Sequence, residues 1–437
     1  MRNRLFSLLI FAVISSGLVC GQAAPASTQP EPTIQSLLQR IQQLENRIDQ
    51  LEERDRQRSK PQPLTAEATP PQPMPTEAPP KLKPPAQPSP SPMRAEHPEH
   101  GTFAQEVERH YPSLQIRGFG DVNFSSTDQK GSISGFNLGQ FDLHFASPLS
   151  EKVSYFGEVT FTARPTGYDL QLERTIIRYD YNDYFKMSFG KYHTPIGYWN
   201  AAFHHGAWLQ TTISRPEMVQ IGGSFIPVHF VGLLAEGNVP SGGLGLGYSV
   251  GLGNGRSSVF SRAGDSGDAN NNRAWVATVF SRPARFYGFQ FGGSVYRDKL
   301  TPVPGQNFSE AIESAHLVWT KEHPEVLSEF FNVHHRDLQT SRTFNSQAFY
   351  VQLGYRLRFQ ENKWKPYYRF EYIHRPTNEP VWDFTGVPVV SDLVGSTVGL
   401  RYDITNYAAL KGEYRNDRVG TDEPRINGVF LQTAFTF

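Results

Sequence analysis

The chain ends on the stretch GVFLQTAFTF, residues 428 to 437, which contains no charged residue. With the period of two that a strand imposes, one face holds Val429, Leu431, Thr433, Phe435 and Phe437, and the other holds Phe430, Gln432, Ala434 and Thr436. The first face is almost wholly apolar, although only 38% of the chain is hydrophobic. A chain end in water normally frays, so this strand is expected to lie in apolar surroundings.

Alternating stretches of the same kind recur upstream. Between residues 114 and 437 we count sixteen, with about 20 residues for each strand and its connection. The alternation is clearest in SQAFYVQLGYRLRF, residues 346 to 359, where the polar face carries Tyr350, Gln352, Arg356 and Arg358. It is least clear in DLQLERTIIRYDY, residues 169 to 181, where two arginines share a face with leucine and isoleucine.

Aromatic residues are numerous for such a polar chain, with 31 Phe, 19 Tyr and 6 Trp. No stretch after the N-terminal segment is apolar enough to form a transmembrane helix. Alternating strands can still place these side chains in a membrane, because only every second residue must be apolar.

The connections between the predicted strands alternate in length. Tight turns such as SPLSE (147–151) and EHP (322–324) follow the even strands, and longer segments such as SSTDQKGSISG (125–135) follow the odd ones. Short turns on one rim and long loops on the other are typical of outer-membrane barrels, and closure removes the sheet edge that lipid does not tolerate. The predicted fold class is all-β: a transmembrane antiparallel β-barrel of about sixteen strands over 114–437, preceded by a short coiled-coil helix and a Pro-rich linker.

The N-terminus resembles a secretory signal peptide. Two arginines precede an apolar run over residues 5–19, and small residues follow, so we predict a signal over 1–23 with cleavage after Ala23 or Ala26. Cys20 is the only cysteine, and the Leu-Val pair before it lacks the small residue expected before a lipidated bacterial cysteine. Removal of Cys20 with the signal is therefore favoured over lipidation, and no disulfide is expected.

Residues 33–58 are predicted to form a coiled coil in the periplasm. The a and d positions of its heptads are Ile34, Leu37, Ile41, Leu44, Ile48 and Leu51. The repeated units RIQQLE and RIDQLE add Arg40, Glu45, Arg47 and Glu52 beside this seam. The doubled arginine and glutamate pattern resembles short three-stranded coiled coils, whereas Ile at a with Leu at d favours a dimer. We expect a trimer, with the dimer as the alternative.

Residues 59–110 are predicted to be a linker. The segment is rich in proline and has too few apolar residues to bury a core. In the polyproline conformation, some 40 residues reach on the order of 100 Å. The linker would therefore hold the coiled coil away from the barrel.

These features resemble trimeric Gram-negative outer-membrane porins, in particular the phosphate-selective and DcaP-like families, the latter with a periplasmic coiled coil before the barrel. The resemblance rests on the terminal Phe437 with its alternating strand, on FGKYHTPIG at residues 189–197, and on the two heptad units. It implies a homotrimer in the outer membrane and a third loop that folds inward to narrow the pore.

The third long connection, from His193 to about residue 225, is the candidate pore constriction. Its candidate residues are His193, Tyr198, Trp199, His204, His205, Trp208, Arg215 and Glu217. Basic and aromatic groups predominate, and a narrow, partly dehydrated passage magnifies each charge. This composition would favour anionic or aromatic solutes over cations.

The last strands place a second set of basic residues on the inward face. This predicted lumen ladder comprises Arg356, Arg358, Arg369, Arg401, Lys411 and Arg415, opposed by Glu371, Asp403 and Glu413. It supports an anion preference. The alternative is ordinary pairing of lumen charges between neighbouring strands.

Other functional classes have less support. The pairs His204-His205 and His334-His335 offer at most one metal ligand to each face of a strand, and no nucleophile has a catalytic setting, so we predict no metal, no cofactor and no enzyme. Acidic and basic residues number 42 each, which argues against nucleic acid as a partner. The coiled coil and linker leave a periplasmic tether, with peptidoglycan as partner, as the alternative function.

The sequence thus predicts a porin of the bacterial outer membrane with its N-terminal segment in the periplasm. Its expected partners are outer-membrane lipid, further copies of itself and small hydrophilic solutes, with anions preferred. The expected mechanism is passive selection by a water-filled lumen, a loop constriction and charged walls.

Overall fold

The computed structural model describes residues 112–203, 206–220, 225–257, 259–260, 262, 264–383 and 391–437. The predicted signal peptide, coiled coil and linker lie outside the described residues, as do His204 and His205. No helix among the described residues is long and apolar enough to cross a membrane.

Sixteen antiparallel strands form a closed barrel in which each strand pairs with its neighbours in sequence. The first eight are β1 (Gln115–Thr127), β2 (Gly135–Pro148), β3 (Val153–Arg164), β4 (Gly167–Asn182), β5 (Phe185–His193), β6 (His229–Val239), β7 (Leu246–Asn254) and β8 (Ala274–Ser281). The others are β9 (Phe289–Val303), β10 (Gln306–Trp319), β11 (Glu325–Asp337), β12 (Thr343–Gly354), β13 (Trp364–His374), β14 (Leu393–Thr405), β15 (Ala408–Val419) and β16 (Ile426–Thr436). The predicted fold class and strand number are confirmed.

The barrel closes where β1 meets β16. Residues 119–127 pair antiparallel with residues 428–436. Beyond them, the Gly118 N–H donates to the Phe437 carbonyl and the Phe437 N–H donates to the Gly118 carbonyl, both at 3.0 Å. The chain end is therefore part of the closing seam, as its alternating pattern predicted.

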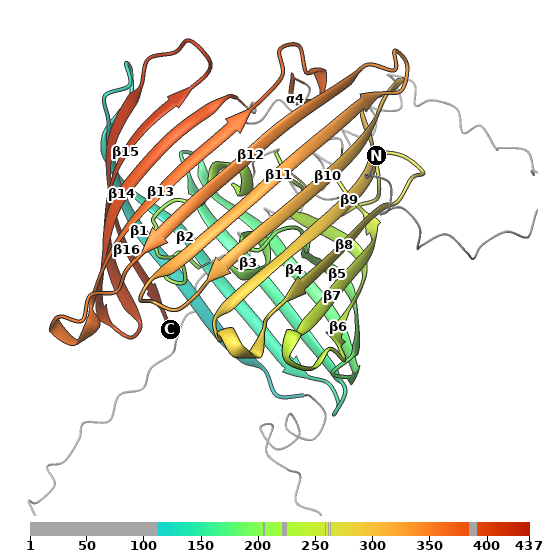
Figure 1. Ribbon diagram of the computed structural model, residues 1–437, viewed down its shortest axis with the longest axis horizontal. Coiled ribbons are helices and arrows are strands. Elements are labelled where there is room, and N and C mark those ends of the chain that lie inside the picture. The colour runs from blue at the N-terminus through green and yellow to red at the C-terminus, as the bar shows by residue number, and fades with distance from the viewer. Residues whose placement is uncertain are drawn as a thin grey trace, which may run out of the picture. The chain divides into compact units, whose positions relative to one another are not determined.

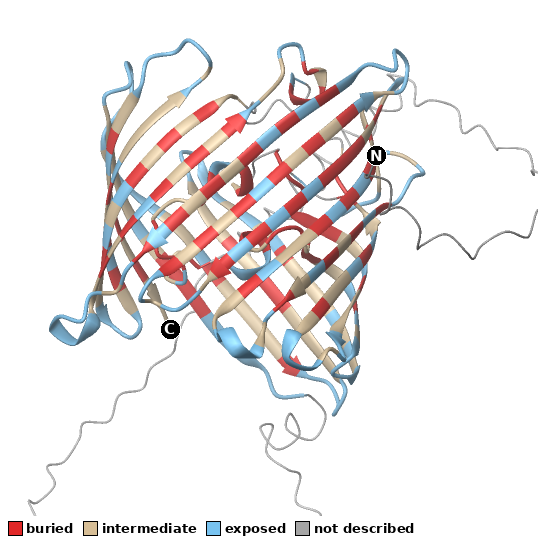
Figure 2. Ribbon diagram, in the orientation of Figure 1, coloured by how far each residue is buried: buried red, intermediate tan, exposed pale blue. Residues whose placement is uncertain are grey.

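Alternate residues of each strand face the interior and the exterior (Figure 2). In β12, Tyr350 and Gln352 are buried inside the barrel, and Leu353 is exposed outside it. This confirms the predicted parity of the strand up to Gly354. Its predicted extension to residue 359 is wrong, because β12 ends at Gly354 and residues 355–363 form the connection to β13.

The predicted alternation of short and long connections holds for only part of the barrel. Long loops do follow β5 (194–228), β7 (255–273) and β13 (375–392). The connections 165–166 and 304–305 on the same rim have only two residues each, because β3, β4, β9 and β10 extend further than their sequence pattern indicated.

A β-bulge accounts for the unclear parity of β4. The register with β3 shifts where Glu158 pairs with Arg174 and Val159 pairs with Leu172, which leaves Glu173 as the extra residue. Before the bulge, Leu170 and Leu172 face outward, and after it Arg174 faces the lumen. The bulge therefore brings Glu173 and Arg174 together into the interior.

The loop between β5 and β6, here called the third loop (194–228), folds inside the barrel (Figure 1). It contains the short helices α3 (Trp199–Ala202) and η1 (Glu217–Val219). Four other short helices lie in connections: η2 (Gly242–Leu244), η3 (Ala284–Phe286), η4 (Gln360–Asn362) and α4 (Pro380–Asp383). Apolar side chains of the third loop pack on the wall formed by β8 to β13, where Trp199, Tyr296, Tyr350 and Phe331 are almost fully buried. That side of the lumen is therefore filled.

Candidate functional site

Glu329 of β11 holds the start of the third loop. Its Oε1 accepts hydrogen bonds from the Trp199 N–H at 2.9 Å and from the Tyr350 hydroxyl at 2.8 Å, and its Oε2 accepts from the Tyr198 N–H. Gly197 precedes them with φ at +70°, and a Cβ there would lie 2.2 Å from the Glu329 carboxylate. Only glycine fits this turn, so the end of the FGKYHTPIG stretch is the point at which the loop docks on the wall.

Arg369 of β13 holds the middle of the third loop. Its guanidinium donates to the Ser214 carbonyl at 2.7 Å, to the Ser214 hydroxyl at 2.6 Å and to the Arg215 carbonyl at 3.2 Å, while its Nε pairs with Glu371 at 2.7 Å. Arg369 is 1% exposed, so its charge is balanced by buried partners rather than presented to the lumen.

Two further residues of the predicted ladder bind the same loop. Arg401 donates to the carbonyls of Trp208 and Gln210 at 2.8 and 2.7 Å. Lys411 donates to the carbonyls of Ala207 and Thr212 at 2.5 and 3.0 Å. The structure therefore brings Arg369, Arg401 and Lys411 together beneath the third loop, where all three bind its backbone oxygens.

The remaining ladder residues lie apart from this group. Arg356 is in the connection after β12 and pairs there with Glu322 and Asp403. Arg358 is exposed in the same connection. Arg415 pairs with Glu413 at 2.6 Å and lies over the Phe430 ring. The six residues do not form one continuous row, because the strand predicted to carry Arg356 and Arg358 inward ends before them.

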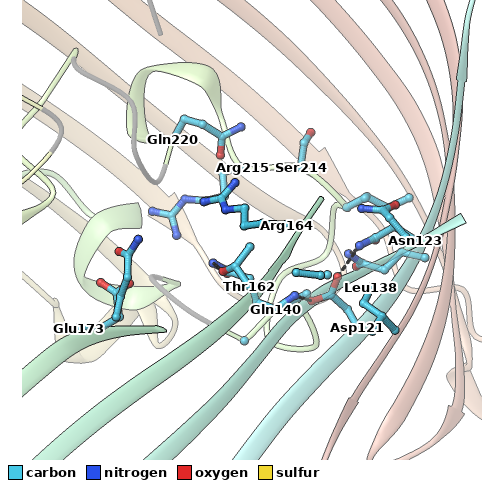
Figure 3. A pocket seen from close by; sticks show the side chains of 18 of the residues that line it. Asp121, Asn123, Leu138, Gln140, Thr162, Arg164, Glu173, Ser214, Arg215 and Gln220 are labelled. Atoms are coloured by element: carbon cyan, nitrogen blue, oxygen red, sulfur yellow. Dashed lines mark hydrogen bonds between the residues drawn. The ribbon is translucent and has the colours of Figure 1, made fainter. Parts of the chain in front are cut away.

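An outer cavity of about 840 Å³ lies between the third loop and β1 to β4, on the side of the long loops. Figure 3 shows Arg215 and Gln220 of the third loop on one side, facing Asp121, Gln140 and Arg164 on the barrel wall. Lys191 also lines it, as do Arg262 and Asp265 of the loop between β7 and β8 (255–273), here called the fourth loop. The cavity is polar and charged, as a passage for hydrophilic solutes requires.

An inner cavity of about 680 Å³ lies on the other side of the third loop, toward the short turns. Pro195 and Ala201 of the loop line it together with Arg174, Arg178 and Asp180 of β4, and with other residues of β1 to β7. Arg178 pairs with Asp180 at 2.6 Å. The two cavities thus lie along the β1 to β6 wall, one on each side of the third loop.

A cluster of carboxylates and histidines separates the two cavities on that wall. Glu158 contacts His144 at 2.9 Å and His193 at 3.6 Å, and it pairs with Arg174. Glu173 pairs with His229 at 2.7 Å and accepts a hydrogen bond from Thr160 at 3.1 Å. The rings of His193 and His229 are 5.6 Å apart, so the two halves of the cluster are in contact.

The structure distributes the described candidate constriction residues over several environments instead of bringing them together. His193, at the end of β5, belongs to the wall cluster, and Arg215 lines the outer cavity while it donates to the Val219 and Phe203 carbonyls. Trp199 is instead fully buried against Tyr350.

Three other candidates lie elsewhere on the loop. Tyr198 is half-buried near Phe203, and burial raises the pKa of its hydroxyl. Trp208 lies against the Arg401 guanidinium. The Glu217 N–H donates to Glu371 at 2.6 Å; enclosure by the barrel and the nearby Glu371 carboxylate raise the pKa of Glu217.

Several residues of the site were not found by sequence reasoning. Glu173 and Arg174 were hidden by the bulge, which breaks the period of two on which the inward positions were assigned. Glu158 and Glu329 do occupy inward positions of alternating strands, and a charged residue at such a position was the available signal.

A second buried network joins three loops to the wall. Arg256 of the fourth loop contacts Glu310 of β10 at 3.0 Å and donates to the Phe225 carbonyl of the third loop at 2.9 Å. His335 of β11 lies between Glu310 and the seventh-loop Glu379, at 3.0 and 3.4 Å. Its neighbour His334 faces outward and bonds Asn345 at 2.6 Å, so the His334-His335 pair is divided between two faces. No group of three or more His, Cys, Asp or Glu suited to a metal ion occurs in the described part of the chain.

Comparison with known proteins gives similarity of structure only. No family model matches the chain, and no curated protein sequence matches it. An anion-selective porin from Comamonas acidovorans superimposes with a TM-score of 0.54 at 9% identity, over 75% of this chain and 100% of that one. The outer-membrane channel DcaP of Acinetobacter baumannii superimposes with a TM-score of 0.52 at 13% identity, over 74% of this chain and 97% of that one. The trimer form of OmpT, an outer-membrane protein of Vibrio cholerae, superimposes with a TM-score of 0.50 at 13% identity, over 74% of this chain and 99% of that one. The chain therefore has the fold of the outer-membrane porins.

Proposed function

We propose that the protein is an outer-membrane porin through which small hydrophilic solutes diffuse passively. The observation that carries this proposal is the pair of cavities lined by charged residues on either side of the third loop, inside a closed barrel of sixteen strands. The interior wall along the path carries charged groups, while the outward residues of the same strands are apolar. A hydrophilic path inside an apolar exterior is suited to conduction across a membrane.

The assembly and the N-terminal segment belong to the same proposal. We infer a homotrimer, which the trimer form of the Vibrio protein supports by analogy. The DcaP-like arrangement would place the coiled coil of residues 33–58 in the periplasm, joined to the barrel by the linker of residues 59–110. A tether to peptidoglycan would be compatible with conduction, since the coiled coil and the barrel are separate parts of the chain.

The charges along the path support a weak anion preference. Four cations line the outer cavity (Arg164, Lys191, Arg215 and Arg262) against three carboxylates (Asp121, Glu173 and Asp265). Arg174 and Arg178 oppose Asp180 and Glu236 in the inner cavity, and Glu158 lies between the two cavities. The named cations and carboxylates are thus equal in number, six of each. In the outer cavity two cations, Arg164 and Arg262, are exposed, whereas Asp265 is the only exposed carboxylate of the three that line it. Glu158 and Glu173 are buried in hydrogen bonds.

Conductance of the purified full chain in planar bilayers tests this function. We expect stepwise single-channel currents, and a reversal potential in a potassium chloride gradient that shows chloride permeating slightly ahead of potassium. Clear cation preference would contradict the selectivity and leave the channel in place. Folded barrels that give no current, together with unchanged solute uptake and a weakened envelope in a deletion strain, would favour the tether instead.

A further inference from the structure

The outward face of β9 to β12 changes from apolar to charged toward the rim of the long loops. The outward positions at this end of β9 are Arg297 and Lys299, and those of β11 are Asn332, His334 and Arg336. The same part of β10 carries Glu313, and that of β12 carries Asn345 and Gln347. We call Arg297, Lys299, Glu313, Asn332, His334, Arg336, Asn345 and Gln347 the outer polar patch.

The orientation of this patch follows from its neighbours in sequence. Glu310 and His335 point into the barrel, where they are fully buried in the network that holds the loops. Residues next to them must therefore face outward. In agreement, Arg297 and Arg336 are exposed and Lys299 is half-buried. Among the described residues, no side-chain hydrogen bond or ion pair engages any of these three cations.

The register places the cations on both sides of a shallow trough. Ser309 of β10 pairs with Lys299 on one side and with Arg336 on the other, and Ala311 pairs with Arg297 and His334 in the same way. Both central residues are small. Two strand spacings separate the flanking strands, so the cations stand about 10 Å apart across the trough.

The apolar band below the patch is short for a membrane barrel. On β10, only Trp319, Leu317 and Ala315 precede Glu313 on the outward face. On β2, the outward face carries five apolar residues: Phe145, Leu143, Phe141, Leu138 and Phe136. With the usual strand tilt, three such residues cover about 15 Å of height and five cover about 25 Å, the normal height of the band. The patch therefore begins where a full apolar band would continue.

A second copy of the chain does not offer a complementary surface. The outward positions of β1 to β8 and β14 to β16, in the described structure, carry no carboxylate, and the only outward cation among them near the long loops is Arg418. Three unpaired cations would thus meet apolar or like-charged residues in such a contact, which is unfavourable. A partner that brings its own negative charge fits better.

We propose that the outer polar patch binds the phosphorylated sugar headgroup of a glycolipid in the outer leaflet. Phosphate oxygens would accept hydrogen bonds from Arg297, Lys299 and Arg336, and sugar hydroxyls would bond the amides of Asn345 and Gln347. The short apolar band then places the patch at the level of the headgroups. The inference rests on the proposed outer-membrane location, but it concerns the exterior of the barrel and not the path through it.

Native mass spectrometry of the full chain in neutral detergent tests the proposal, with bisphosphorylated lipid A as the probe. The same lipid without its phosphates is the reference ligand. We expect preferential binding of the phosphorylated form, and a loss of about 10-fold or more in affinity for the variant Arg297→Gln/Lys299→Gln/Arg336→Gln. The matched control Arg285→Gln/Lys321→Gln/Arg418→Gln removes three cations elsewhere on the exterior and rims, and it should bind as the wild type does.

The outcomes are distinct. Equal binding of the two lipids by the wild-type protein, or equal loss in both variants, would overturn the proposal. A change of oligomeric state with unchanged lipid affinity would overturn it too, since the patch would then be a contact between copies. If the triple variant does not fold, the comparison of the two lipids on wild type and on Arg336→Gln decides. Single-channel current measured on the same samples reports separately on the proposed function.

Discussion

At the scale of single residues, charged side chains of β11 and β13 hold the third loop in place instead of lining an open pore. Glu329 accepts two backbone hydrogen bonds from the start of the loop and one from the Tyr350 hydroxyl of β12, and Arg369 donates to the middle of the loop. Backbone groups of a loop inside a barrel need such partners, because an unpaired buried polar group is costly. The identity of these residues therefore matters first for loop position and only second for ion selectivity.

Replacement of Arg369 and of Arg164 should separate these two roles. Arg369→Gln leaves Glu371 without its buried partner and removes bonds to the third loop, so we expect about 3 kcal/mol lower stability and noisier single-channel current. Arg164→Gln removes an exposed charge from the outer cavity and should shift the reversal potential toward cations with little change in stability. Thermal unfolding measures the change in stability, and the reversal potential measures the change in ion selectivity. A larger potential shift for Arg369→Gln than for Arg164→Gln would contradict this assignment.

Glu217 should give the third loop a dependence on pH. Enclosure and the Glu371 carboxylate raise its pKa above 4.5 in the folded protein, so its charged form is disfavoured there. A raised folded-state pKa contributes stability that is present below the unfolded value and is lost as pH rises through the folded value. Acidification from neutral to mildly acidic pH should therefore quiet the open-channel current, because Glu217 becomes protonated at a pH at which an ordinary glutamate is still charged. The open-channel current of Glu217→Gln should be quiet at neutral and at acidic pH. If this variant showed the same pH response as the wild type, Glu217 would not be the group responsible.

At the scale of elements, the seam between β1 and β16 depends on two glycines covered by aromatic rings. A Cβ on Gly118 would lie 2.3 Å from the Phe437 ring, and one on Gly120 would lie 2.7 Å from the Phe435 ring. The rings cover strand positions that lack side chains, and Phe437 also stacks on Phe141 with centroids 5.7 Å apart. The apolar face of the last strand thus serves closure as well as contact with lipid.

Substitution at this seam should impair assembly of the barrel. Gly118→Val would displace the Phe437 ring, and we expect a clear fall in the fraction of heat-modifiable, folded protein in outer-membrane extracts. Gly135→Val is the matched control, because a Cβ on Gly135 meets no atom within 4 Å. Gel mobility before and after heating measures the folded fraction. Equal yields for the two variants would show that ring coverage of Gly118 is unimportant for closure.

At the scale of the whole molecule, the lumen is divided into a filled half and an open half. The third loop packs on β8 to β13 through a common apolar core, and both cavities lie on the opposite side. The fourth and seventh loops are fastened to the filled half through Arg256, Glu310 and His335. Solutes that pass the barrel would therefore follow one wall, past Glu158 and Glu173.

Single cysteines should reveal this asymmetry. A cysteine at Thr162, which lines the outer cavity, should react with a charged thiol reagent and lower the conductance. A cysteine at Ser314, an inward residue of β10 on the filled side that is only 9% exposed, should react slowly and leave the current unchanged. Signal-peptide removal would take Cys20 with it, so the mature wild-type chain serves as the unreactive control. Rapid block through Ser314→Cys with none through Thr162→Cys would place the path on the other wall.

The sequence by itself determined the closed sheet and its last strand. A period of two is a local property, so Tyr350, Gln352 and Leu353 could be assigned to their faces from neighbouring residues alone. The role of Phe437 followed from the same pattern, and the count of about sixteen strands followed from the number of stretches that show it.

Only the tertiary structure decided what the lumen charges do. Arg369, Arg401 and Lys411 meet loop atoms more than 150 residues away in sequence, and a long irregular loop has no period from which its path could be predicted. The bulge at Glu173 moved two charged residues inward against the local pattern. The face on which a strand residue lies depends on its position relative to adjacent residues. The partners of an inward charged residue depend instead on which distant segment of the chain packs against it in the lumen.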